Sequence, residues 1–196
     1  MIRNNFKIGV AGTHSTGKST FVCDVENVLA AEGVAVARIE NLATRAQEIG
    51  FPILSKHTFE STLWIIAECM RKEMEASLSA QVILVDRPVP DALGYLLAAL
   101  EVSGRNIGER RLSALRQIVA AHINDYDHLI ITDLDPSISL GEGRDADECF
   151  RAAAGRNITT IVKEFAPNVA VMTADNAPNV TANAISLVRQ WRDATR

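Results

Sequence analysis

The amino-acid sequence predicts a three-layer α/β domain, in which a five-stranded parallel sheet is covered by helices on both faces. Five short apolar runs alternate along the chain with longer segments of helical periodicity, and this alternation is typical of parallel strands joined by crossover helices. A glycine-rich motif separates the first apolar run from the first helical segment. At 196 residues and 47% hydrophobic, without a linker or low-complexity tract, the chain is expected to form one domain, 1–196.

The glycine-rich motif predicts a phosphate-binding loop. Residues 12–19 read GTHSTGKS, which matches the pattern G-x-x-x-x-G-K-S/T. A strand predicted at 6–11 precedes the motif and a helix predicted at 17–32 follows it, and the helix presents its positive end to a bound anion. The sequence therefore predicts a site for a nucleoside triphosphate, which we take to be ATP.

Each residue type in the loop suits this chemistry. Gly12 and Gly17 allow a tight turn that brings backbone N–H groups to phosphate oxygens. We expect Lys18 to reach the β- and γ-phosphates and the Ser19 hydroxyl to bind Mg²⁺. The residues predicted to hold the nucleotide are Gly12, Thr13, His14, Ser15, Thr16, Gly17, Lys18, Ser19 and Thr20.

The second strand is predicted at 34–39 and ends at Glu40. Ligands of doubly wound sheets bind beyond the carboxyl ends of the strands, so Glu40 is placed to orient or deprotonate a phosphoryl acceptor. A solvated loop acid is the alternative interpretation of Glu40. A short helix, 42–50, follows and carries Arg45.

A long helix is predicted at 58–80. Its apolar residues recur at helical spacing and are expected to form a core stripe; they are Leu63, Ile66, Ala67, Met70, Met74 and Leu78. Charged residues mark the face expected to contact solvent, and these are Glu60, Arg71, Lys72, Glu73 and Glu75. Cys23 and Cys69 fall in helical patterns and are expected to be buried, reduced thiols.

The third strand, 81–86, is an apolar run that ends in Asp86. A carboxylate at the end of a strand is what a Walker B segment uses to hold Mg²⁺, so Asp86 is expected to share the metal with Ser19. The next residues open a helix that continues through Leu100, and Asp91 near its start has simple helix capping as its alternative role.

A movable lid is predicted after the fourth strand, 127–132, which itself follows a helix at 108–124. The segment 135–156 carries glycines and arginines and leads into a helix, and Arg144 and Arg151 are expected to contact phosphate charge from it. A polar surface loop is the alternative. The last strand is predicted at 168–172 and the closing helix at 179–191.

The net charge and the composition of the chain argue against several classes of binding partner and location. A net charge of −4 and a pI near 5.6 argue against a broad basic surface for duplex nucleic acid. No run approaches the ~18 apolar residues that a membrane span requires, and no signal sequence precedes the first strand, so a cytoplasmic protein is expected. The three cysteines are widely spaced and suggest neither a zinc site nor a disulfide framework.

Taken together, the motifs resemble those of the P-loop kinases of nucleosides and nucleotides, and most of all the AAA-type ATPase/kinase family that contains the nicotinamide-riboside kinase domain. The resemblance is carried by GVAGTHSTGKST at the front, by VDRPVPDALGY at 85–95 and by the arginine-rich segment 141–156. It implies a strand order of 2-3-1-4-5, a substrate cleft beyond the strand ends, and a lid that closes over ATP and Mg²⁺.

The resemblance also implies roles for individual residues. Asp86 and Arg87 match an Asp-Arg pair near the metal and the phosphates, while Asp91 and Tyr95 match positions that line the substrate pocket. Arg45 corresponds more weakly to an arginine that binds the acceptor. The relatives commonly have an acidic residue three positions before that arginine, where this chain has leucine, so the general base is left open between Glu40, Asp86 and none.

The function predicted from the sequence is an ATP- and Mg²⁺-dependent kinase that transfers the γ-phosphate to a small nucleoside- or nucleotide-like acceptor. In it, Lys18, Glu40, Asp86, Arg87 and Arg144 are the candidate catalytic residues. A nucleotide-dependent ATPase switch that acts on a macromolecular partner and a polynucleotide 5′-kinase are the alternatives. The acceptor, the choice between ATP and GTP, and the oligomeric state are not readable from the sequence.

Overall fold

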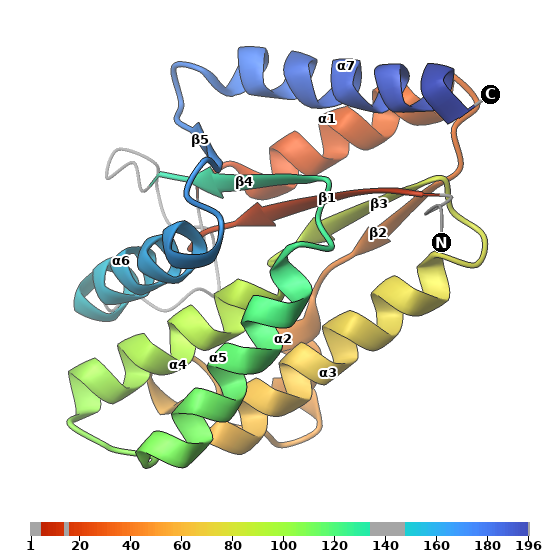
Figure 1. Ribbon diagram of the computed structural model, residues 1–196. Coiled ribbons are helices and arrows are strands. Elements are labelled where there is room, and N and C mark those ends of the chain that lie inside the picture. The colour runs from red at the N-terminus through yellow and green to blue at the C-terminus, as the bar shows by residue number, and fades with distance from the viewer. Residues whose placement is uncertain (1–4, 14–15, 134–147, 196) are drawn as a thin grey trace.

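The computed structural model describes residues 5–13, 16–133 and 148–195, and it contains a parallel sheet between two layers of helices (Figure 1). The strands run in the spatial order β2-β3-β1-β4-β5, and every pairing is parallel. Both the strand number and the order 2-3-1-4-5 are confirmed. The strands are β1 (Phe6–Ala11), β2 (Val36–Ile39), β3 (Val82–Asp86), β4 (His128–Thr132) and β5 (Ala170–Met172).

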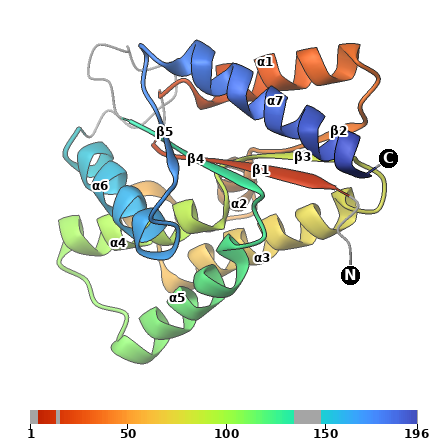
Figure 2. The same cartoon turned by 45° about the horizontal axis from the view of Figure 1, so that its top comes forward.

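The helices divide unequally between the two faces of the sheet, as Figures 1 and 2 show. Two helices, α1 (Lys18–Ala31) and α7 (Ala177–Thr195), pack on one face. The other face is covered by α2 (Leu42–Glu48), α3 (Phe59–Ala76), α4 (Val89–Ser103), α5 (Glu109–Ile123) and α6 (Glu148–Phe165). A 3₁₀ turn, η1 (Leu54–Lys56), lies between α2 and α3 and has no counterpart in the sequence-based prediction.

The central strand, β1, explains why the strands read as nearly continuous apolar runs. All six of its residues are buried, because helices cover both of its faces. Ile8 and Val10 point toward α1 and α7, whereas Ala11 belongs to the core on the opposite face. The two cores therefore meet only through the sheet.

The helices α4 and α6 touch at the backbone. A Cβ atom built on Gly94 would lie 2.5 Å from Ile158 Cγ1 and 2.8 Å from Ile158 Cα, which is closer than real Cβ atoms approach. Only glycine fits this crossing. Since both helices border the loop edge of the sheet, the contact fixes the position of one helix relative to the other.

The expected core stripe of the long helix is partly wrong. Met74 and Leu78 are 61% and 87% exposed, and the helix ends at Ala76, before Leu78. Glu73, predicted to face solvent, is instead only 1% exposed. The buried face of α3 passes through Ile66, Cys69 and Glu73, because polar partners from other elements surround the Glu73 carboxylate and replace water there.

The two helical cysteines differ from each other. Cys69 is buried, as expected, but Cys23 is exposed and that prediction is wrong. The buried face of α1 is formed by Phe21, Val22, Val25 and Leu29, and Cys23 follows Val22 onto the outer face.

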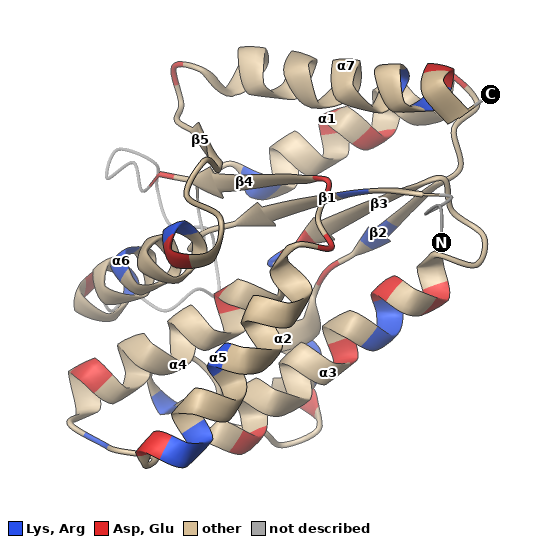
Figure 3. Ribbon diagram, in the orientation of Figure 1, with Lys and Arg blue, Asp and Glu red and all other residues tan. Residues whose placement is uncertain are grey.

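The charged residues of the described helices are mixed in sign. On α3, arginine, lysine and glutamate lie side by side, and acidic and basic residues also adjoin at the start of α5 (Figure 3). Within the described ranges, no helix combines the length and the apolar character needed to cross a membrane.

Candidate active site

The parallel sheet collects the predicted functional residues at one edge. Because all five strands run the same way, their carboxyl ends meet there. Gly12 follows β1, Asp86 ends β3, Thr132 ends β4 and Glu40 follows β2. Residues separated by up to 120 positions in the sequence thus gather at the edge of the sheet that carries the phosphate loop.

The loop itself is held by its glycines and by the end of β4. Gly12 has φ +140°, and a Cβ atom there would lie 2.0 Å from Thr132 Oγ1. The hydroxyls of Thr16 and Thr132 are 2.6 Å apart, and Thr132 Oγ1 donates to the Ala11 carbonyl at 3.1 Å. Gly17 begins α1 with φ +82° and offers no side-chain cap, so the first N–H groups of α1 are available to an anion.

Lys18 lies inside the loop. It is 4% exposed, and its ammonium group donates to the Thr13 carbonyl oxygen and, at 3.2 Å, to Thr16 Oγ1. Ser19 and Thr20 lie on the exposed side of the first turn of α1. The predicted nucleotide residues His14 and Ser15 are outside the described residues. The described part of the phosphate loop therefore holds a buried cation.

Ser19 and Asp86 form a pair that suits Mg²⁺. Ser19 Oγ donates to Asp86 Oδ2 at 3.0 Å, and the other oxygen, Oδ1, is buried without a hydrogen bond from any described residue. A hydroxyl and a carboxylate are the oxygen ligands that Mg²⁺ takes beside substrate phosphates and water. The described part of the chain holds no cluster of three or more His, Cys, Asp or Glu side chains for a metal, so this pair would leave most coordination positions to phosphate and water.

Arg87, Asp91 and Tyr95 come together at the start of α4. Arg87 Nη1 donates to Tyr95 OH at 2.8 Å and to the Gly12 carbonyl at 3.4 Å, and it lies 4.0 Å from Asp91 Oδ2. The backbone of Arg87 has φ +70°, an unfavourable conformation for a residue with a side chain. Such strain is typical of functional positions. Three of the residues implied by the family resemblance thus form one cluster against the phosphate loop.

Asp91 binds the loop directly. Its carboxylate accepts the Gly12 N–H at 3.2 and 3.3 Å and is 2% exposed. The alternative of helix capping does not hold, because Pro88 occupies the N-cap position of α4 and the Asp91 carboxylate accepts the Gly12 N–H instead. Burial raises the pKa of Asp91 to about 7, outweighing the opposite effects of Arg87, Lys18 and the Gly12 N–H.

Replacing this carboxyl with an amide tests the consequence of burial. In the unfolded chain the group loses its proton near its ordinary pKa of 3.8, whereas in the folded protein it does so near 7. Its contribution to stability is thus complete below pH 4 and is lost as the pH rises to 7. Asp91→Asn keeps an oxygen for the Gly12 N–H, so without nucleotide at pH 8 we expect its melting temperature to exceed that of the wild type by roughly 5 °C.

The difference between the two proteins should vanish at pH 4, where the native carboxyl is also neutral. Melting curves at pH 4, 6 and 8 measure it. The exposed aspartate of α1 provides the control, Asp24→Asn, which should follow the wild type. Equal melting temperatures for Asp91→Asn and the wild type at every pH would contradict the conclusion that burial raises the pKa of the Asp91 carboxyl.

His57 and Arg105 extend the cluster. The His57 ring is buried 5.9 Å from the Tyr95 ring, and Arg105 Nη2 donates to the backbone carbonyls of Ser55 and His57 at 3.1 and 3.0 Å. Burial, together with the charges of Arg105 and Arg87, lowers the pKa of His57 to about 4, so the ring is neutral at physiological pH. Neither His57 nor Arg105 was among the site residues predicted from the sequence.

Two other predicted residues pair with charged side chains outside this cluster. Glu40 pairs with Arg38 of β2 at 2.6 Å, and Arg45 pairs with Glu48 on the solvent side of α2 at 3.1 Å. Arg151 is buried on α6. Arg144 and most of the predicted lid, 135–156, lie outside the described residues, and the end of that segment forms the first turns of α6.

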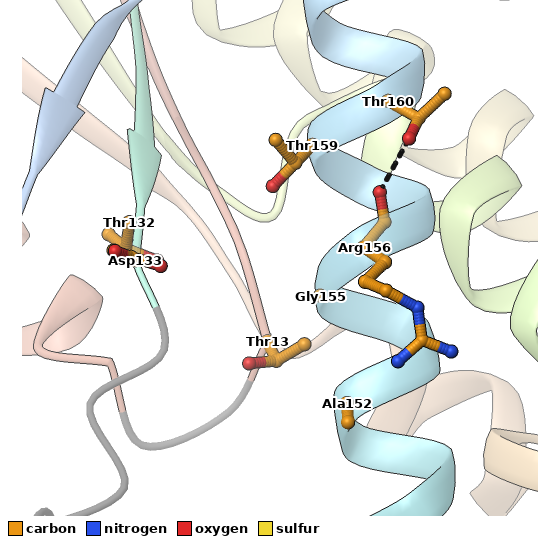
Figure 4. A pocket seen from close by; sticks show the side chains of 8 residues that line it. All are labelled: Thr13, Thr132, Asp133, Ala152, Gly155, Arg156, Thr159 and Thr160. Carbon is orange, nitrogen blue, oxygen red and sulfur yellow. Dashed lines mark hydrogen bonds between the residues drawn. The ribbon is translucent and has the colours of Figure 1, made fainter.

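A cavity of about 480 Å³ lies between the phosphate loop, the end of β4 and α6 (Figure 4). Its lining residues are Thr13, Thr132, Asp133, Ala152, Gly155, Arg156, Thr159 and Thr160. Thr13 Oγ1 is buried without a hydrogen bond from any described residue. This cavity was not predicted from the sequence, although the small residues Ala152 and Gly155, three positions apart on α6, are a signal for a close approach to the loop.

Comparison with known proteins gives the fold a name. No protein-family model matches the chain, and no curated protein sequence matches it. A solved structure of the NadR protein in complex with NR is similar, with a TM-score of 0.63 and 14% identity. Deoxyadenosine kinase from M. mycoides with bound dATP is also similar, with a TM-score of 0.58 and 12% identity. The fold is that of the P-loop kinases.

The extent of the two similarities differs. The match with NadR covers 86% of this chain but 45% of the NadR chain, so the protein spans about half of that relative. The match with deoxyadenosine kinase covers 96% of this chain and 100% of the other. The P-loop kinase fold implied by the resemblance of the motifs is therefore confirmed.

Proposed function

We propose that the protein is an ATP-dependent kinase that transfers the γ-phosphate to a hydroxyl or phosphate of a small nucleoside-like acceptor. The observation that supports this most directly is the convergence of two clusters on one loop. The first cluster is Lys18 with the Ser19–Asp86 pair, and the second is Arg87 with Asp91 and Tyr95. One provides positive charge and oxygen ligands, and the other provides polar and aromatic side chains beside them.

The nucleotide side of the site is assigned to the loop. In the proposal, backbone N–H groups of the loop and of the first turn of α1 bind the phosphates, and Lys18 exchanges its internal hydrogen bonds for phosphate oxygens. Ser19 and Asp86 hold Mg²⁺, which neutralises charge on the β- and γ-phosphates when it is bound. Arg151 and Arg144 keep their predicted contacts with phosphate charge as part of the proposal.

The acceptor side is assigned to the start of α4. Arg87 lies between Gly12 and Tyr95, so it can bind an anionic or hydroxyl group next to the transferred phosphate. Asp91, Tyr95 and neutral His57 offer hydrogen bonds and aromatic surface to a nucleoside-like molecule. Glu40 and Arg45 are retained as proposed acceptor contacts, which would require them to leave Arg38 and Glu48.

A strong general base is not essential to this proposal. Phosphoryl transfer depends mainly on positioning and on stabilisation of charge around the transferred group. Glu40 at the end of β2, or Asp86 beside the metal, supplies a carboxylate if one is needed.

The two similar structures support the choice of acceptor class, since one is described in complex with NR and the other is a deoxyadenosine kinase.

An acceptor screen tests the proposal. The purified protein, with Mg²⁺ and ATP, is incubated with a panel of nucleosides, nucleoside monophosphates and nicotinamide riboside, and ADP release is followed. We expect one acceptor class to raise the rate by about 100-fold or more over the rate without acceptor. Asp86→Asn should abolish the acceptor-dependent rate, whereas the surface variant Lys163→Ala should retain it.

Slow ADP release that no acceptor accelerates would contradict the small-molecule kinase. If ADP release then increased when a protein partner was added, the result would favour the ATPase switch. If single-stranded oligonucleotides with 5′ hydroxyl ends became phosphorylated, the result would favour the polynucleotide 5′-kinase. Product identification by mass spectrometry separates phosphate transfer to an acceptor from transfer to water.

A further inference from the structure

A second buried polar cluster is centred on Glu73 of α3. The side chain of Glu73 is fully buried, and its carboxylate meets four polar groups from β1, α3, α5 and the α5–β4 turn. Lys7 Nζ and His122 Nε2 lie 2.6 and 2.7 Å from Oε2. Tyr126 OH donates to Oε1 at 2.7 Å and Cys69 Sγ donates to the same oxygen at 3.3 Å. No site residue predicted from the sequence belongs to this cluster.

The cluster keeps Glu73 ionised. Burial alone would raise the pKa of Glu73, but its hydrogen bonds with His122 and Lys7 and their charges hold that pKa at about 2. The carboxylate is therefore an acceptor throughout the neutral range, and it does not donate to the Tyr126 hydroxyl. This leaves the hydroxyl with its proton directed at Glu73 and its lone pairs directed elsewhere.

The lone pairs of Tyr126 face the start of α4. Tyr126 OH accepts the backbone N–H of Val89 at 3.2 Å. Val89 is the first residue of α4, where N–H groups lack partners within the helix, and the N-cap residue Pro88 has no side-chain acceptor to offer. A hydroxyl from another element thus performs the capping that serine or aspartate usually performs from within the chain.

The Tyr126 ring is also wedged against the sheet. A Cβ atom on Gly9 would lie 3.0 Å from Tyr126 Cδ1, 3.2 Å from Pro88 Cβ and 2.9 Å from Leu129 Cδ1. The absence of a side chain at Gly9 therefore allows the ring and Pro88 to rest together on the backbone of β1, three residues before the phosphate loop begins. Both ends of Tyr126 are fixed, the ring by packing and the hydroxyl by two hydrogen bonds.

We propose that Tyr126, oriented by Glu73, is a positioning residue that sets the first turn of α4, and with it Arg87 and Asp91, against the phosphate loop. Val89 lies two residues after Arg87 and two before Asp91. Arg87 bonds the Gly12 carbonyl and Asp91 bonds the Gly12 N–H, so both contacts depend on where this turn lies. The expected effect on catalysis rests on the proposed kinase function, whereas the positioning of the first turn of α4 by Tyr126 does not.

The variant Tyr126→Phe removes one oxygen and keeps the ring. Two readouts are made on the full-length protein. The first is independent of catalysis: the titration of Asp91, followed by NMR of carbon-13-labelled aspartate side chains, is expected to shift its midpoint by about 1 pH unit, because the Gly12 N–H and Arg87 contacts change. The second is steady-state kinetics, in which kcat/KM for the acceptor is expected to fall by about 10- to 100-fold while KM for ATP changes little.

A matched control separates positioning from loss of stability. Val188→Ala truncates a buried side chain of α7 in the core on the opposite face, so it lowers the melting temperature without touching α4. It should leave the Asp91 titration and the acceptor kinetics unchanged. If Tyr126→Phe also leaves both unchanged, the positioning role is wrong. A shifted Asp91 titration in a protein that phosphorylates no acceptor would retain the positioning role and reject the kinase.

The wild-type protein provides a measurement that does not depend on a folded variant. The Val89 amide is expected to exchange with solvent deuterium as slowly as amides inside α4, although first-turn amides of helices ordinarily exchange quickly. Fast exchange at Val89 would show that the Tyr126 hydroxyl does not hold this turn and would overturn the proposal.

Discussion

Lys18→Ala is expected to lower kcat/KM for ATP by about 100- to 1,000-fold, because the loop loses the buried cation that meets the phosphate charge. The ammonium group lies inside the loop, on the Thr13 carbonyl and Thr16 Oγ1, at the position that phosphate oxygens would occupy. The positive charge is therefore already placed before the nucleotide binds, so its removal should affect the transition state more than the fold.

The measurement combines two assays. ADP release gives kcat and KM, and titration with a fluorescent ATP analogue gives nucleotide affinity directly. The matched variant is Lys163→Ala, which removes an exposed lysine from α6 and should behave as the wild type. Full activity of Lys18→Ala, at unchanged nucleotide affinity, would show that the loop does not bind the transferred phosphate.

Gly12→Ala is expected to reduce the free energy of unfolding by about 4 kcal/mol and to abolish nucleotide binding. The added methyl group would lie 2.0 Å from Thr132 Oγ1, a hydroxyl that also bonds Thr16 and Ala11. Relief of this clash requires the loop to separate from β4. The φ of +140° at Gly12 adds backbone strain for any residue with a side chain.

A second glycine isolates the effect of the clash. Gly33 also has a positive φ, +74°, but nothing lies within 4 Å of a Cβ atom built there. Gly33→Ala should therefore cost only the backbone strain, about 1 kcal/mol, and leave nucleotide binding intact. Urea unfolding curves of the three proteins provide the comparison. If the Gly12→Ala protein were as stable as Gly33→Ala, then Gly12 would not pack against Thr132 at the end of β4 as described.

The sequence was most informative where function depends on local order along the chain. The motif at 12–19 predicted the loop and its neighbouring strand and helix, because glycine spacing and apolar runs are local signals. Ser19 and Asp86 were predicted to share Mg²⁺, and in the structure the Ser19 hydroxyl and the Asp86 carboxylate lie 3.0 Å apart. Their proximity follows because parallel strands bring their carboxyl ends to one edge whatever their separation in sequence.

The sequence was least informative where a side chain depends on distant partners. Glu73 follows Arg71 and Lys72, so its local pattern indicated a solvated face, yet its partners Lys7 and Tyr126 are 66 and 53 positions away. The cavity beside Thr13 is also built from three separate elements. Pattern analysis detects periodicity within one element, whereas burial of a charge is decided by which groups the tertiary fold brings to it.

The backbone contact at Gly94 couples the helices α4 and α6, so that they are expected to move together. On α4, Asp91 and Tyr95 stand within one turn of Gly94, and on α6, Gly155 stands within one turn of Ile158 and lines the cavity beside the loop. Since close-packed backbones cannot slide past each other without a clash, a ligand that displaces α6 also displaces the residues that bind Gly12 and Arg87. Occupancy of the cavity and of the cluster on α4 is therefore expected to be cooperative, so that each ligand changes the affinity for the other by the same factor.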